Sequence, residues 1–166
     1  MKQIKKLLLS LSVLLACPVV ISAQSKSEEK KLRAQMVKEC VESKKYTVEP
    51  RSALTMGGRN ISLLSYYSLK ISNDSVYSYL PYYGRAYSVP YGGGEGLDFE
   101  AKILDYKQTV GKKGNYEIKF SARTHEDLYT FNISIYDNGV SNIHVTMQNK
   151  QSIDFIGDLL IEENKE

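Results

Sequence analysis

The sequence predicts an α+β domain in which one N-terminal amphipathic helix packs on a curved, mainly antiparallel β meander of about eight strands. Three observations lead to this prediction. Apolar residues recur at helical spacing only before residue 46. After it, apolar and polar residues alternate in short runs that turn residues separate. Strands and helices do not alternate, so a parallel Rossmann-like sheet is not expected, whereas eight antiparallel strands can close into a barrel.

The first 23 residues have the three parts of a secretory signal peptide. Three lysines precede an apolar run over residues 7–15, and the small residue Ala23 precedes the expected cut. We expect cleavage between Ala23 and Gln24, and hence an exported protein that is periplasmic or secreted. The apolar run is shorter than the roughly 20 residues that a helix needs to cross a bilayer, so no transmembrane helix is expected in the mature chain.

A second processing route competes with this cleavage. The residues Leu14-Leu15-Ala16-Cys17 resemble the lipobox of bacterial lipoproteins, in which the cysteine becomes the lipidated first residue. The apolar stretch over residues 18–21 argues against it, because a lipoprotein usually has a polar tether there. The alternative is therefore a lipoprotein anchored at Cys17.

Removal of the signal changes the charge of the chain. Three of the 22 basic residues lie in the signal, which leaves 19 basic and 19 acidic residues in the mature chain. A chain without net charge has no strongly basic surface for nucleic acid, so no nucleic-acid partner is expected. Only Cys40 remains after the signal is removed, which excludes an intramolecular disulfide in the mature chain.

The mature chain is expected to form one folded unit. Residues 24–45 form a frayed N-terminus and an amphipathic helix, and residues 46–166 form the β domain on which that helix packs. The apolar stripe of the helix consists of Leu32, Met36, Val37, Cys40 and Val41. Cys40 lies on this stripe and is interpreted as a small core residue rather than a catalytic thiol.

The β domain is read from alternation and turn residues. A short strand at 46–48 is expected to stop at Pro50, and a turn follows at 56–58. Asn138-Gly139 is the strongest hairpin signal in the chain. The remaining strands are expected at residues 61–71, 75–80, 97–110, 116–122, 129–135, 140–147 and 153–160.

One stretch of the β domain resembles a known family. Residues 78–99, SYLPYYGRAYSVPYGGGEGLDF, are similar to the central motif of the family called domain of unknown function 4251. The segments at 46–51, 113–115 and 151–153 also fit, so the resemblance covers nearly all the mature chain. Members are secreted or lipidated envelope proteins of Gram-negative bacteria. The resemblance implies export and this fold, and it brings no activity, cofactor or catalytic residue.

The same stretch holds the best candidate for a binding site. Eight of the 13 tyrosines lie between residues 66 and 91. Tyrosine presents an apolar face and a hydroxyl, which suits a sugar, a peptide or another protein, and an arginine can bind a carboxylate. The competing interpretation is a crossover whose rings pack over an open end of the sheet. The candidate binding residues of this Tyr/Gly-rich loop are Tyr82, Tyr83, Arg85, Tyr87, Tyr91 and Glu95.

Other sites have little support. The glycines at 92–94 are not followed by the Lys-Ser or Lys-Thr of a phosphate-binding loop. His125 and His144 are the only histidines, so a His-rich metal site is excluded, and no metal or cofactor is expected. Glu95, Asp98 and Glu100 are the carboxylates near the loop that are considered for glycosidase-like chemistry, and Asp98 and Glu100 share one face of a strand.

These observations rank three hypotheses of function. The first is a non-enzymatic exported protein of the cell envelope that contacts a protein or a glycan through the Tyr/Gly-rich loop. The second is a carrier of a small apolar ligand in a cavity enclosed by the strands. The third and lowest is a hydrolase of envelope polymers that uses Asp98 or Glu100.

Overall fold

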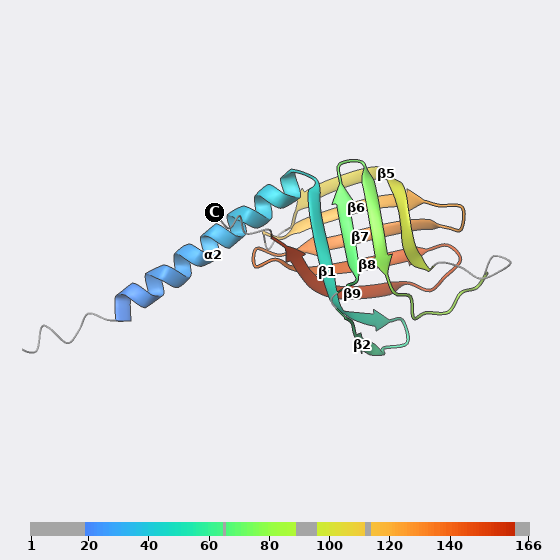
Figure 1. Ribbon diagram of the computed structural model, residues 1–166, viewed down its shortest axis with the longest axis horizontal. Coiled ribbons are helices and arrows are strands. Elements are labelled where there is room, and N and C mark those ends of the chain that lie inside the picture. The colour runs from blue at the N-terminus through green and yellow to red at the C-terminus, as the bar shows by residue number, and fades with distance from the viewer. Residues whose placement is uncertain (1–18, 65, 89–95, 112–113, 162–166) are drawn as a thin grey trace, which may run out of the picture.

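The protein is a β-barrel from which one long helix projects (Figure 1). The computed structural model describes the backbone of residues 19–64, 66–88, 96–111 and 114–161, and side chains from residue 26 onward. The helix is α2 (Val19–Glu42). The strands are β1 (Lys45–Thr55), β2 (Asn60–Ser62), β3 (Ser68–Ser72), β4 (Ser75–Leu80), β5 (Leu97–Val110), β6 (Tyr116–Arg123), β7 (Leu128–Ile135), β8 (Val140–Met147) and β9 (Ile153–Leu160).

The barrel is closed by eight strands. Strands β3 to β9 follow one another as an antiparallel meander, and β1 pairs with both β3 and β9, so that the first and last strands join. Strand β2 pairs with β1 and adds a short hairpin outside the ring. The antiparallel meander and its closure are thus confirmed. The fold is mainly β with one N-terminal helix, so the expected elements are present but the class is closer to all-β than to α+β.

Strand β1 is longer than predicted because it continues through Pro50. The register of β1 and β9 shifts between Pro50 and Ser52, and a proline, which has no amide hydrogen, is tolerated at such an irregularity. Opposite Pro50 lies Gly157. A Cβ atom at Gly157 would be 2.1 Å from the carbonyl oxygen of Glu49 and 2.6 Å from the Cα of Pro50. The close approach of the two backbones therefore requires glycine at position 157.

A second difference concerns residues 61–71, which were predicted as one strand. The chain instead forms the short strand β2, leaves the sheet after Ser62, and enters β3 at Ser68. The predicted pairing across Asn73 and Asp74 is confirmed, since β3 and β4 form the adjoining hairpin. Asn73 has a positive φ of 57°, a conformation that asparagine tolerates better than most residues.

The core fills the interior of the barrel. On β7, residues at alternate positions are buried, from Tyr129 through Phe131 and Ile133 to Ile135. Aromatic rings stack across the interior, with the centroids of Phe120 and Phe131 4.9 Å apart. The alternation that predicted the strands therefore follows the two sides of the barrel wall, one facing the core and one facing water.

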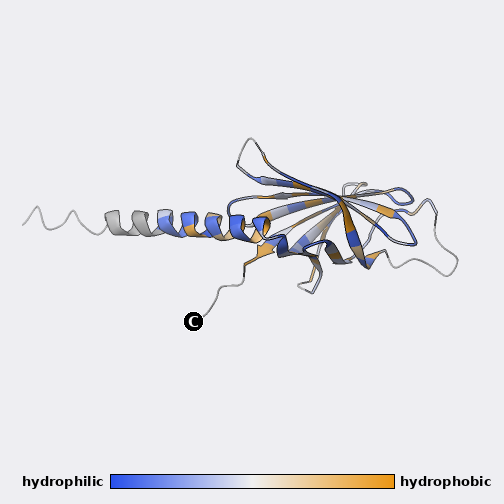
Figure 2. Ribbon diagram, turned by 90° about the horizontal axis from the view of Figure 1, so that it is seen from above, coloured by the Kyte–Doolittle hydropathy of each residue, from blue (hydrophilic) through white to orange (hydrophobic). Residues whose placement is uncertain are grey.

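Helix α2 contacts the barrel only near its C-terminal end. Val37 and Val41 are completely buried and Cys40 is partly buried, but Leu32 is 58% exposed. Figure 2 shows the mostly hydrophilic helix extending away from the barrel. Arg33 is held by a hydrogen bond of 2.7 Å from its Nε to the carbonyl of Asn138, in the β7–β8 turn. The predicted apolar stripe therefore packs on the barrel only around residues 37–41, because a closed barrel offers the helix only one end.

The expected export signal lies largely outside the described residues. Residues 1–18, which include Cys17, are among those not described, and the expected cut between Ala23 and Gln24 falls within α2. Among the described residues, no helix is both long and apolar enough to span a membrane.

Candidate functional site

The Tyr/Gly-rich loop connects β4 to β5 across one end of the barrel. Residues 81–88 and 96 of this loop are described, whereas Tyr91, Glu95 and the glycines between them lie outside the described residues. The backbone of the described part is bound to the β8–β9 turn. The amide of Tyr87 donates to the carbonyl of Asn149 at 2.7 Å, and the amide of Gln151 donates to the carbonyl of Arg85 at 2.9 Å.

Tyr82 fastens the same part of the loop through its side chain. Its hydroxyl donates toward the carbonyl oxygens of Arg85 at 3.0 Å and of Gln151 at 2.9 Å, and its ring packs on the core. Burial raises the pKa of Tyr82, although the hydrogen bond to Gln151 opposes that shift. Tyr82 therefore holds the loop in place and is also a candidate contact residue. This role agrees with the alternative interpretation, in which the rings of the loop pack over one end of the barrel.

The other three described candidates are exposed. Tyr83 and Arg85 face solvent, and Tyr87 is 69% exposed. These side chains do not converge on a single point. Tyr83 instead lies near Tyr67, which belongs to a group of tyrosines from other segments.

We call this group the tyrosine cluster; it consists of Tyr66, Tyr67, Tyr79 and Tyr83. The ring centroids of Tyr66 and Tyr67 are 4.4 Å apart, and those of Tyr67 and Tyr79 are 5.5 Å apart. The hydroxyls of Tyr66 and Tyr67 are 3.4 Å apart. Their hydrogen bond, with the nearby Tyr83 and Tyr79 hydroxyls, raises the pKa of Tyr67 to about 12. The hydroxyl of Tyr67 therefore stays neutral at any physiological pH.

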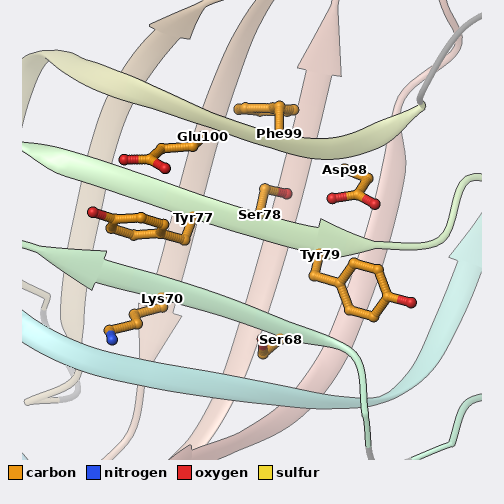
Figure 3. Close-up of a pocket in the computed structure, with 8 residues that line it drawn as sticks. All are labelled: Ser68, Lys70, Tyr77, Ser78, Tyr79, Asp98, Phe99 and Glu100. Atoms are coloured by element: carbon orange, nitrogen blue, oxygen red, sulfur yellow. The ribbon is translucent and has the colours of Figure 1, made fainter.

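A hollow of about 520 Å³ lies beside the tyrosine cluster on the outer wall of the barrel. Figure 3 shows its floor, where side chains of β3, β4 and β5 lie in rows across the strands. The strand register places Tyr77 beside Glu100 and Tyr79 beside Asp98. The lining residues are Ser68, Lys70, Tyr77, Ser78, Tyr79, Asp98, Phe99 and Glu100.

Polar contacts order the side chains of this hollow. The largest contribution that raises the pKa of Tyr77 is a hydrogen bond between its hydroxyl and the Glu100 carboxylate. The negative charge of Glu100 raises this pKa further. The ammonium of Lys70 lies 5.7 Å from the centroid of the Tyr77 ring, within the range of a cation–π interaction. The hollow thus offers aromatic faces, hydroxyls and two carboxylates to a ligand.

Comparison with known proteins agrees with this architecture. The family model described as "Domain of unknown function (DUF4251)" matches residues 28–159. The chain belongs to the DUF4251 family. A crystal structure of a DUF4251 protein from Bacteroides eggerthii is similar in fold, with a TM-score of 0.60 and 13% sequence identity over 78% of this chain and 88% of that one. No curated protein matches the chain.

A second, smaller hollow of about 160 Å³ adjoins the first in this DUF4251 protein. The two hollows share Asp98, Phe99 and Glu100, and the second extends to the β6–β7 turn. Beneath it the buried ammonium of Lys150 lies 3.1 Å from the carboxylate of Glu126, another buried side chain. The remaining lining residues are Gly96, Thr124, His125, Glu126 and Tyr129.

Asp127 fixes the turn that borders this second hollow. One carboxylate oxygen accepts hydrogen bonds from the amides of Leu128 and Gln148, and the other accepts from the amide of Asn149. His125 is the exposed member of the turn. Within the part of the DUF4251 chain that the structure describes, no group of three or more His, Cys, Asp or Glu side chains is arranged to hold a metal ion.

Three members of the tyrosine cluster were not among the predicted site residues. Tyrosines are dense between residues 66 and 91, but the predicted candidates all lie in the loop. The alternation of β4 places Tyr77 and Tyr79 on the outer wall, which the sequence pattern could have revealed. Tyr66 and Tyr67 lie close to Tyr79 because the chain leaves the sheet between β2 and β3 in this DUF4251 fold. No local sequence pattern predicts that break.

Proposed function

We propose that this protein is a non-enzymatic, exported protein of the bacterial cell envelope that binds a partner through the tyrosine cluster. The observation that carries the proposal is the gathering of Tyr66, Tyr67 and Tyr79 on the outer wall, where these rings do not serve the core. Tyr66 is 54% exposed and Tyr79 is 44% exposed. Tyrosine is enriched at the centres of protein interfaces, where its ring contributes area at little cost in conformational entropy.

The orientation of the rings favours a protein partner over a glycan. Tyr67 and Tyr79 are inclined by 35° to each other, and Tyr66 and Tyr67 by 47°. Rings at these angles form an uneven surface that side chains of a partner can interlock with. A sugar chain that stacks on several rings at once favours faces that lie in one plane. A glycan remains the alternative partner, and the test below distinguishes the two.

The other two hypotheses find less support. The barrel interior is occupied by large buried side chains such as Phe120, Phe131 and Phe155, whereas a carrier of an apolar ligand needs room there. Asp98 and Glu100 lie on the open outer wall, where water reaches both. A hydrolase usually encloses its carboxylates so that their pKa values differ.

Site-specific photo-crosslinking in the producing bacterium tests the proposal. A photoreactive phenylalanine analogue replaces Tyr79, and in a control strain it replaces Val110, which is 68% exposed on the far half of β5. We expect a discrete crosslinked protein at position 79 and none at 110. We also expect that Tyr66→Ser with Tyr67→Ser removes the product.

Two outcomes would contradict the proposal. Equal crosslinking at positions 79 and 110 would mean that the tyrosine cluster is not a preferred contact surface. Crosslinks to polysaccharide instead of protein would replace the protein partner by a glycan.

A further inference from the structure

The two halves of strand β5 pair with different neighbouring strands. Its first half pairs with β4, from Leu97 to Lys102, and its second half pairs with β6, starting at Ile103 opposite Ala122. Strand β6 ends at Arg123, so among the described residues no strand lies beside residues 97–101 of β5 on the side away from β4. The closed barrel therefore contains a short stretch of open strand edge.

Two backbone amides point into this open edge. The amide of Ile103 donates to the carbonyl of Asp74, which lies on the β4 side. Hydrogen-bonding direction alternates along an antiparallel strand. Ala101, Phe99 and Leu97 therefore turn their amides toward β4, and the amides and carbonyls of Asp98 and Glu100 turn to the open side. An edge with free amides and carbonyls is a template for another strand.

The side chains of this edge alternate in the same way. Asp98 and Glu100 project from the outer wall, as Figure 3 shows, and neither forms an ion pair among the described residues. Phe99 and Ala101 face inward but are only partly buried, unlike the completely buried Leu97. An added strand would place alternate side chains beside the two carboxylates and the others over Phe99 and Ala101.

The surroundings set the register of such a strand. The hollow of about 160 Å³ beside the edge is bordered by the β6–β7 turn, which includes Thr124 and the exposed His125. Lys102 and Arg123 are exposed at the end where β6 begins to pair with β5. Negative charge is thus concentrated at the other end, around Asp98 and Glu100. Opposite charges on directly neighbouring strands attract, and like charges repel.

We propose that the open edge of β5 binds an extended peptide segment of a partner protein in which basic residues alternate with apolar ones. The backbone of the peptide pairs with Asp98 and Glu100, its lysine or arginine side chains lie beside those carboxylates, and its apolar side chains cover Phe99 and Ala101. Recognition by strand addition combines backbone hydrogen bonds with side-chain pockets at every second residue. This inference rests on the proposed function, since it specifies the kind of partner that the neighbouring tyrosine cluster contacts.

Binding of designed peptides to the purified protein tests the inference. The probe is a fluorescent, end-capped octapeptide of alternating lysine and valine, and the readout is fluorescence anisotropy. One control peptide has glutamate in place of lysine. A second has the same side chains but N-methylated backbone amides, which removes the amide hydrogens that could pair with β5 while the charge stays the same. We expect saturable binding of the first peptide and at least tenfold weaker binding of both controls.

Two protein variants locate the binding site. Asp98→Asn with Glu100→Gln is expected to weaken binding of the lysine peptide at least tenfold. The matched control is Asp105→Asn with Asp137→Asn, which removes the same charge from two exposed positions outside the edge and is expected to bind as the unchanged protein does. Amide hydrogen exchange gives a direct readout, because peptide binding should slow exchange at Asp98 and Glu100 and leave Phe99 unchanged.

The outcomes separate this inference from the proposed function. Equal affinity for the lysine–valine peptide and its N-methylated form would overturn strand addition, since charge alone would then explain binding. No binding of the probe at 1 mM, or equal weakening by both double variants, would overturn it as well. A tyrosine-dependent crosslink at position 79 would survive any of these results, so the proposed function fails only by its own experiment.

Discussion

The ammonium of Lys150 and the carboxylate of Glu126 form an ion pair of 3.1 Å in which both side chains are at least 93% removed from solvent. Lys150 also lies 5.9 Å from the centroid of the Tyr129 ring and 3.4 Å from the carbonyl of Gly96. Burial by itself lowers the pKa of Lys150, but the hydrogen bond to Glu126 and the nearby Tyr129 outweigh it, so the net pKa is raised. The pair thus joins the β6–β7 turn, the β8–β9 turn and the end of the Tyr/Gly-rich loop.

Lys150→Met is therefore expected to be strongly destabilising. It leaves the Glu126 carboxylate buried without its ammonium partner, which typically costs about 3–5 kcal/mol of unfolding free energy. Denaturation by urea measures the loss. The double variant Lys150→Met with Glu126→Gln should be less destabilised than the single one, because no uncompensated charge remains. A lower unfolding free energy for the double variant than for Lys150→Met alone would contradict this account.

Tyr82→Phe tests whether the loop is fastened by the Tyr82 hydroxyl. The substitution removes the hydrogen bonds to the carbonyls of Arg85 and Gln151, and we expect a loss of about 1–2 kcal/mol. Faster amide exchange at Tyr87 should accompany it. The control is Tyr87→Phe at an exposed ring, which should change stability by less than about 0.5 kcal/mol.

Gly157→Ala tests the close contact between β1 and β9. The new methyl group would collide with backbone atoms of Glu49 and Pro50, which cannot rotate away as a side chain does. We expect a loss of about 3 kcal/mol or more, or failure to fold. Gly57→Ala is the matched control, because the nearest atom to its Cβ would be 3.8 Å away. A thermal melt of both variants is sufficient, and similar melting temperatures would refute the explanation.

The two ends of α2 should respond differently to truncation of their side chains. Val41 is completely buried, so Val41→Ala should cost about 1–2.5 kcal/mol. Leu32 projects into solvent, so Leu32→Ala should change stability by less than about 0.5 kcal/mol. Urea denaturation distinguishes the two. A comparable loss at both positions would mean that the helix covers the barrel along its length after all.

The raised pKa of Tyr67 predicts that this tyrosine ionises only at high pH. The ordinary pKa of tyrosine is about 10, and that of Tyr67 is raised to about 12. Since the folded state favours the neutral hydroxyl, the stability contributed by Tyr67 is present below pH 10 and is lost as the pH rises toward 12. The difference in ultraviolet absorbance between the unchanged protein and Tyr67→Phe should titrate near pH 12. A midpoint near pH 10 would show that the hydrogen bond with Tyr66 is not maintained.

Local patterns predicted the second half of the barrel well and its beginning less well. The strand expected at residues 116–122 is β6, from Tyr116 to Arg123, because alternating apolar residues report directly which side of the wall they face. The predicted end of the first strand at Pro50 was wrong. The register shift that tolerates a proline there depends on the facing strand β9, which the local sequence does not reveal. The apolar stripe on α2 also suggested more packing than the structure shows. Such a stripe does not reveal how much of the barrel surface the helix can contact.

The candidate site was predicted in composition and only partly in place. Tyr83 was expected and joins the tyrosine cluster, whereas Tyr66 and Tyr67 reach it from a segment that was taken for a strand. Tyr82 holds the loop against the barrel, which is the role expected under the alternative interpretation of a crossover with packed rings. Tertiary placement of this kind arises from contacts between distant segments, and a single sequence does not record those contacts.

The pairing of β1 with β9 has a consequence for how the protein reaches its folded state. Thr47 is the neighbour of Leu160, so the ring closes only when the two extremes of the β domain meet. Closing a loop of that length costs conformational entropy before the stabilising contacts between the strands form. Folding is therefore expected to be slow compared with helical proteins of similar size. Until the last strand arrives, both β1 and β8 present open edges that invite aggregation. A ribosome that still holds the final strand therefore holds the whole domain back from folding.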